Sequence, residues 1–78
     1  MQHDVKILPE YFKDVKSGKK HFELRRDDRN YNVGDDLHME EWTPEGSYTG
    51  EDIVKEITYV LRNCPEYGLM NGYCIVGW

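Results

Sequence analysis

The sequence predicts one small α+β domain, mainly β, in which about five strands form a partly closed barrel with one N-terminal helix. Its 78 residues leave room for a single domain spanning 1–78. Short stretches of alternating polar and apolar residues recur along the chain, separated by glycine and proline turns. Only one stretch has helical spacing, and closing the sheet protects strand edges that one helix cannot cover. For the same reason a parallel βαβ arrangement is not expected.

The first elements are a short strand and the helix. Residues 3–8 are sufficiently β-branched for a strand. Pro9 suits the first position of a helix, and we predict a helix over Pro9–Lys16. Its apolar residues follow helical spacing: Leu8, Tyr11, Phe12 and Val15. Ser17-Gly18 then supplies a usual helix end.

From Lys20 onwards the period changes to two, which predicts a strand over 20–26. Phe22 and Leu24 are expected to face the core. The other face is then polar and free for function, and it carries His21, Glu23 and Arg25.

The remaining chain alternates again in three stretches. Tyr31–Asp35 is predicted to be a turn and residues 36–42 a strand. After a turn at 43–47 a hairpin partner follows, with one face formed by Ile53, Ile57, Tyr59 and Leu61. The last strand runs over 73–78, and Trp78 is expected to pack inward.

The net charge of −5 is unevenly distributed. Residues 1–31 hold eight Lys or Arg and six Asp or Glu, whereas residues 32–78 hold two and nine, so the two parts carry +2 and −7. An acidic total argues against a sequence-blind coat for nucleic acid. A local basic patch on an acidic body remains suited to one anionic ligand.

The cysteines and the hydropathy indicate a reducing compartment. Cys64 and Cys74 are too few for a disulfide framework and lack zinc-ligand spacing. We expect free thiols, with one bridge between them as the alternative. No stretch has the length of a signal peptide or a membrane span, so a cytoplasmic protein with no membrane partner is expected. No metal or cofactor is expected, and the oligomeric state stays open.

The polar row on residues 20–25 can recognise a nucleotide. Arg25 can offer a bidentate fork to a phosphate or a base edge, and Glu23 can accept a hydrogen bond from an exocyclic amine. Lys20 can neutralise phosphate or act as a base. His21 completes the row, and Tyr48 and Tyr67 are candidates to stack on a base. The alternative is a solvent-facing strand on which Glu23 and Arg25 balance each other.

The segment Gly18-x-Lys20-x-x-Glu23-x-Arg25 resembles the GxKxxExR signature of ASCH domains, small barrels of the PUA-like superfamily. The segment Tyr31-x-Val33-Gly34-Asp35-x-Leu37 is similar to that family's turn into its next strand. The similarity covers almost the whole chain and is strongest to a compact bacterial and phage branch. It implies a pocket between the helix and the barrel, with RNA or a modified nucleoside as ligand.

The resemblance also implies an enzymatic alternative. Some ASCH-like proteins are small amidohydrolases that remove an acyl group from a cytidine derivative, using a lysine and a threonine nucleophile two residues before the arginine. This chain has Lys20 but carries Glu23 at the threonine position, and a carboxylate does not replace a hydroxyl nucleophile. We therefore expect a module that binds RNA, a nucleotide or a nucleoside. Hydrolysis by a Lys20–Glu23 acid–base pair is the alternative, and a protein-interaction domain using acidic residues 35–56 is the second alternative.

Overall fold

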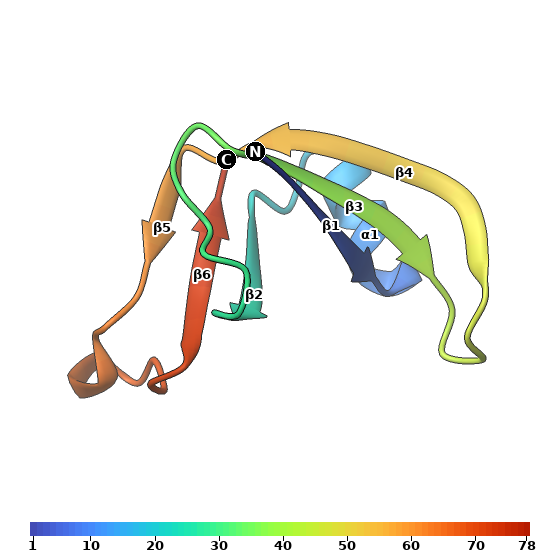
Figure 1. Cartoon of the computed structure of the whole chain (residues 1–78). Helices are drawn as coiled ribbons and strands as arrows, with labels where there is room; N and C mark the ends of the chain where they lie inside the picture. The colour runs from blue at the N-terminus through green and yellow to red at the C-terminus, as the bar shows by residue number, and fades with distance from the viewer.

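The computed structural model describes all 78 residues. It contains six strands and one α-helix, arranged as two three-stranded sheets (Figure 1). In chain order the elements are β1 (Gln2–Ile7), α1 (Pro9–Lys16), β2 (Phe22–Arg26), β3 (Asp36–Trp42), β4 (Tyr48–Glu56), β5 (Tyr59–Leu61), the 3₁₀-helix η1 (Pro65–Tyr67) and β6 (Tyr73–Gly77). The α+β, mainly-β class is confirmed, and so are the bounds of the helix.

The first sheet has the order β1-β3-β4 and contains a parallel pair, which the sequence argument had not expected. β1 pairs in parallel with β3, and β3 pairs antiparallel with β4. The chain passes through α1 and β2 between the two parallel strands. α1 packs against β3 and buries Phe12 and Val15. One eight-residue helix is enough here because only one pair of short strands is parallel.

The second sheet has the antiparallel order β2-β6-β5. The segment predicted to be one hairpin partner of β3 forms two strands, β4 and β5. The chain leaves the first sheet after Glu56 and enters the second at Tyr59. Ile57 marks the crossing: its N–H donates to the carbonyl of Asp35 at 2.8 Å, and its carbonyl accepts the N–H of Gly34 at 2.8 Å. Tyr59 and Leu61 are exposed as a result, and they do not share the buried side of Ile57.

The two sheets do not close into a barrel. β1 and β2 are both edge strands and are not paired with each other. Two guanidinium groups reach β1 instead: Arg25 Nη1 donates to the Lys6 carbonyl at 2.9 Å, and Arg29 Nη1 donates to the Asp4 carbonyl at 2.6 Å. These side chains satisfy acceptors that backbone N–H groups would satisfy in a closed barrel. The expected five-stranded, partly closed barrel is thus replaced by two open sheets.

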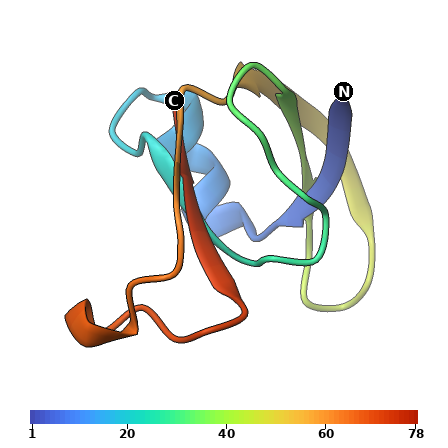
Figure 2. The ribbon, with the colours of Figure 1, turned by 60° about the vertical axis from the view of Figure 1, so that its left-hand side comes forward.

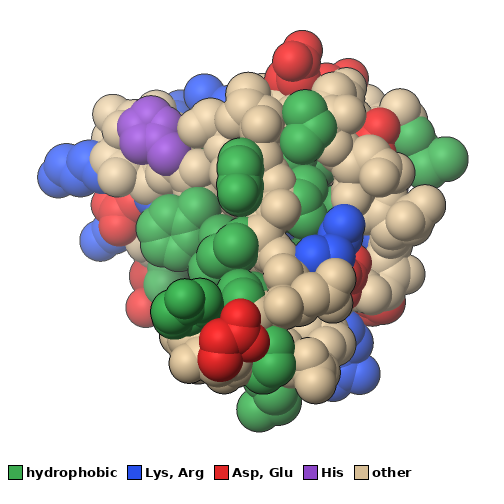
Figure 3. Space-filling model, turned by 90° about the vertical axis from the view of Figure 1, so that its left-hand side faces the viewer, with side chains coloured by type: hydrophobic (Ala, Val, Ile, Leu, Met, Phe, Trp, Pro, Cys, Tyr) green, Lys and Arg blue, Asp and Glu red, His purple; other side chains and the backbone are tan.

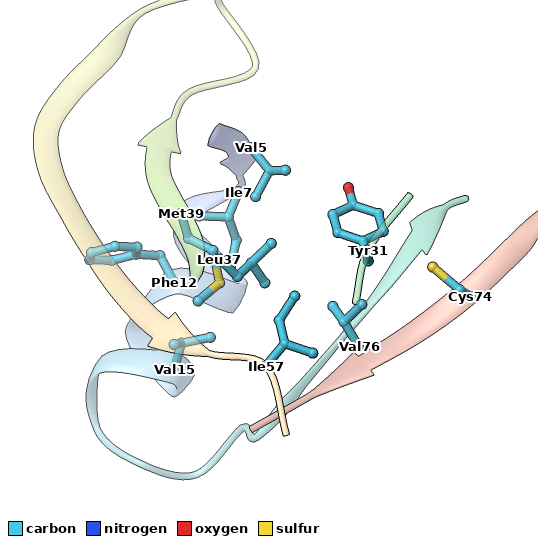
Figure 4. Close-up of a cluster of buried hydrophobic side chains, with 10 residues drawn as sticks. All are labelled: Val5, Ile7, Phe12, Val15, Tyr31, Leu37, Met39, Ile57, Cys74 and Val76. Atoms are coloured by element: carbon cyan, nitrogen blue, oxygen red, sulfur yellow. The ribbon is translucent and has the colours of Figure 1, made fainter. Parts of the chain in front are cut away.

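The core lies between the two sheets, with α1 covering one side (Figures 2 and 4). It contains ten buried apolar residues: Val5, Ile7, Phe12, Val15, Tyr31, Leu37, Met39, Ile57, Cys74 and Val76. Tyr31, which was expected in a turn, is only 1% exposed. Trp78 packs against this cluster as predicted. Cys64 and Cys74 are unpaired, and no helix is long and apolar enough to cross a membrane.

Candidate functional site

Strand β2 has the opposite phase to the one predicted. Glu23 is 6% exposed, whereas Phe22 and Leu24 are 50% and 57% exposed, so the placement of these two apolar residues in the core is wrong. The cause is the pairing of β2 with β6. Glu23 lies opposite Val76, and Val76 faces the core. Residues opposite each other in a sheet share a face, so Glu23 points inward as well.

This phase forms a cleft along the free edge of β2. The cleft has a volume of about 420 Å³, within the range usual for small-molecule sites. It lies between β2, the end of β1 and the first turn of α1. Its apolar lining comprises Ile7, Leu8, Tyr11, Phe22 and Leu24, and its charged lining comprises Lys6, Lys20, Glu23 and Arg25.

Glu23 lies between two cations inside this cleft. Lys20 Nζ donates to Glu23 Oε1, and Arg25 Nη1 lies 3.5 Å from Glu23 Oε2. The side chains of Lys20 and Arg25 are only 16% and 25% exposed. Burying a carboxylate without partners is costly, and here each oxygen has a cationic neighbour. The carboxylate is thereby compensated by both cations, and Arg25 is also held by its hydrogen bond to the Lys6 carbonyl.

The cations of the cleft outnumber its carboxylate. Lys6, Lys20 and Arg25 against Glu23 give a formal charge of +2 in a chain whose total is −5. A guanidinium has five N–H donors and an ammonium has three, so both groups keep donors beyond those that contact Glu23. The cleft is therefore suited to an anion that accepts several hydrogen bonds.

Two aromatic rings flank Lys20. Its Nζ lies 5.0 Å from the ring centroid of Tyr11 and 5.2 Å from that of Phe22. Both side chains are about half exposed, at 46% and 50%. Phe22 was predicted to face the core, and Tyr11 was noted only as one of the apolar residues at helical spacing. The orientation of Phe22 follows from the register between β2 and β6, which no local pattern reveals.

Three of the predicted binding residues lie outside the cleft lining. His21 is exposed ahead of β2, and its carbonyl accepts the N–H of Trp78 at 3.0 Å. Tyr67 lies in η1 and is 87% exposed. Tyr48 starts β4, where Lys6 Nζ lies 6.0 Å from its ring centroid and 4.8 Å from that of Trp42. The structure thus brings together Lys20, Glu23 and Arg25, but not the other three.

The turn at Gly34-Asp35 holds β1 and the loop before β3 together and takes no part in the cleft. Asp35 Oδ2 lies 2.8 Å from His3 Nε2 and accepts the N–H of Asn32 at 3.2 Å. The contact with His3 is the main cause that lowers the pKa of Asp35. The ring of His3 also contacts Tyr31 edge-on, with 4.8 Å between centroids. This turn therefore connects β1 to the loop before β3 and does not reach the cleft.

Comparison with known proteins gives a relative from a phage. The chain is 45% identical over 58 residues to a protein of Escherichia phage P2 described as an uncharacterized 12.9 kDa protein in the GpA 3′ region. The aligned segment covers 74% of this chain and 52% of the phage protein, so the chain spans about half the length of that relative. A family model described as a domain of unknown function, DUF3850, matches residues 2–78. The chain therefore belongs to the DUF3850 family.

Proposed function

We propose that the cleft between α1 and β2 binds a nucleotide or a short single-stranded RNA segment, and that the chain is a PUA-like domain of the ASCH type. One observation carries the proposal. Lys20, Glu23 and Arg25, the charged residues of the ASCH-like signature, all line one cleft instead of spreading into solvent. Because Glu23 is buried, this row of charges differs from the solvent-facing strand that was the alternative.

The lining supplies a separate group for each part of a nucleotide. Lys20 and Arg25 would hold the phosphate, since both retain free donors and the cleft has a positive charge. Tyr11 and Phe22 would offer flat faces to a base, and stacking of this kind tolerates any base. Meanwhile the acidic remainder of the chain would discourage indiscriminate contact with nucleic acid.

Glu23 would position Lys20 and Arg25 in this scheme. Both of its oxygens already have cationic neighbours, and position 23 lacks the hydroxyl that the related amidohydrolases use as nucleophile. Binding is therefore proposed in preference to hydrolysis.

Calorimetric titration with a nucleoside monophosphate and with a short single-stranded RNA tests the proposal. We expect micromolar affinity that weakens as salt concentration rises. Lys20→Gln should weaken binding by at least about tenfold, which corresponds to about 1.4 kcal/mol. The matched control is Lys16→Gln, which removes the same charge from an exposed lysine of α1 whose Nζ lies 2.9 Å from Glu51.

The two variants distinguish binding in the cleft from non-specific electrostatic attraction to the chain. A Lys20→Gln protein that binds like the parent would place the ligand elsewhere. Equal weakening in both variants would indicate non-specific attraction to the basic N-terminal part. Circular dichroism of each variant checks that the fold is retained, because Lys20 also contacts Glu23.

A further inference from the structure

The second sheet carries mainly apolar side chains on its outer face, the face that points away from the core. Antiparallel sheets that cover a core on one side usually show polar residues on the other. Here Cys74 and Val76 of β6 face the core. The outer face carries six apolar or aromatic side chains, Phe22, Leu24, Tyr59, Leu61, Tyr73 and Ile75. Figure 3 shows hydrophobic side chains gathered on this side of the molecule.

The register places these side chains in contiguous rows. Leu24, Ile75 and Leu61 lie opposite one another across β2, β6 and β5, and Phe22 and Tyr59 flank Gly77 in the next row. Phe22, Leu24, Tyr59 and Leu61 are 50%, 57%, 66% and 38% exposed. A contiguous apolar patch of this kind is typical of an interaction surface, whereas scattered apolar residues are not.

We infer that this outer face, formed by β2, β6 and β5, is the interface between two copies of the chain. Its three strands carry one charged side chain on this face, Arg26, and no acidic one. The strands themselves therefore bring no carboxylates together when two chains of net charge −5 meet at this face, and Figure 3 shows an acidic side chain beside the hydrophobic ones. A nucleic-acid strand would need several cations along its path, and this face offers one.

A twofold dimer would bury the apolar area that this face leaves exposed. A standard interface covers about 800 Å² on each partner, which is about a sixth of the 5175 Å² of this chain. Phe22, Leu24 and Tyr59 keep half or more of their side chains exposed and supply the apolar centre of such an interface. A twofold axis brings the same patch of both copies together, so an apolar, nearly uncharged face is complementary to itself.

The dimer would also border the cleft. Phe22 and Leu24 belong both to the outer face and to the cleft lining, so the second copy would lie beside the cleft opening. The dimer does not depend on what the cleft binds, and its test is independent of any ligand.

Sedimentation equilibrium over a range of micromolar concentrations tests the inference. We expect a mass of twice 9.3 kDa, falling towards the monomer on dilution. Leu24→Asp and Leu61→Asp should each give a monomer at concentrations where the parent is dimeric. The matched control is Val54→Asp, at a β4 position that is 49% exposed outside this face, and it should remain a dimer.

A second measurement on the unchanged chain keeps the test independent of variant folding. Amide hydrogen exchange in β5 and β2 should be slower at dimer concentrations than after dilution. A parent that is monomeric throughout, or a Leu61→Asp variant that stays dimeric, would overturn the inference. If the parent is monomeric and Leu61→Asp also weakens RNA binding, the face binds nucleic acid instead of a second copy.

Discussion

Glu23 is the buried carboxylate around which the two cations of the cleft, Lys20 and Arg25, are arranged. A buried carboxylate costs free energy unless charged partners compensate. Lys20, three residues before Glu23, and Arg25, two residues after it, supply those partners. The signature spacing thus has a physical basis: it places one inward carboxylate between two cations at the open edge of a sheet.

Replacing Glu23 tests this arrangement through stability. Glu23→Gln should lower the free energy of unfolding by about 1–3 kcal/mol, because it leaves two partly buried cations without a counter-charge. Urea denaturation measures the change. The control is Glu51→Gln, which breaks an exposed pair with Lys16 and should cost less than about 1 kcal/mol. Equal losses in the two variants would mean that burial of Glu23 has no special weight.

The sequence predicted the charged residues of the cleft but not its walls. Lys20, Glu23 and Arg25 were found because their spacing is a motif. Alternation alone could not tell which face of β2 points inward, since that is fixed by pairing with β6 far along the chain. Phe22 was consequently assigned to the core, and Tyr48 and Tyr67 were chosen for stacking because loops are common binding positions.

At the scale of elements, the first sheet is connected by a histidine between two carboxylates. His38 on β3 has its Nδ1 2.9 Å from Asp4 on β1 and its Nε2 2.6 Å from Asp52 on β4. Both ring nitrogens act as donors only in the protonated imidazole. Asp52, then Asp4, accordingly raise the pKa of His38 above its usual value, with a smaller contribution from Glu40.

The contacts of His38 with Asp4 and Asp52 predict a pH dependence of stability. The pKa of His38 is raised in the folded state. Protonated His38 therefore stabilises the fold, and this contribution to the free energy of unfolding is fully present below about pH 6.5, the usual histidine pKa. It is lost as pH rises through the higher folded value. The melting temperature should therefore fall across this interval, and His38→Gln should remove that part of the fall. Thermal melts of both proteins from pH 5 to about 9 measure it. A parallel pH profile in the variant would assign the effect to other groups.

The helix and β3 were predicted with correct bounds because each has a clear local period. The break between β4 and β5 was not predicted. Ile53, Ile57, Tyr59 and Leu61 look like one alternating face, yet the chain changes sheets at Ile57. The partners of Ile57 there are the backbones of Gly34 and Asp35, and no pattern within residues 48–61 encodes that contact.

For the whole molecule, the expected barrel followed from the need to protect strand edges. The structure meets that need at the edge of β1 with Arg25 and Arg29, whose side chains donate to backbone carbonyls. Arg25 therefore contributes to both the cleft and the contact between sheets. The opening that remains along β2 is the cleft itself, so the incomplete closure provides the candidate site.

A single core shared by two open sheets should unfold as one unit. Ile57 is fully buried at the crossing between the sheets, and Figure 4 shows it between Leu37 and Val76. Ile57→Ala should lower the free energy of unfolding by about 2–4 kcal/mol. A chain of this length has roughly 4–12 kcal/mol in total, so the loss is a large fraction. Ile53→Ala, at a partly buried position of β4, serves as the control and should cost less.

Chemical denaturation followed by both tryptophan fluorescence and far-ultraviolet circular dichroism distinguishes the possibilities. Coincident transitions in the parent and in Ile57→Ala would show that the sheets are one cooperative unit. Two separated transitions in the variant would mean that each sheet has stability of its own. In that case Ile57 would join two separate units instead of belonging to one core. The cleft between α1 and β2 would then be lost whenever either unit unfolds.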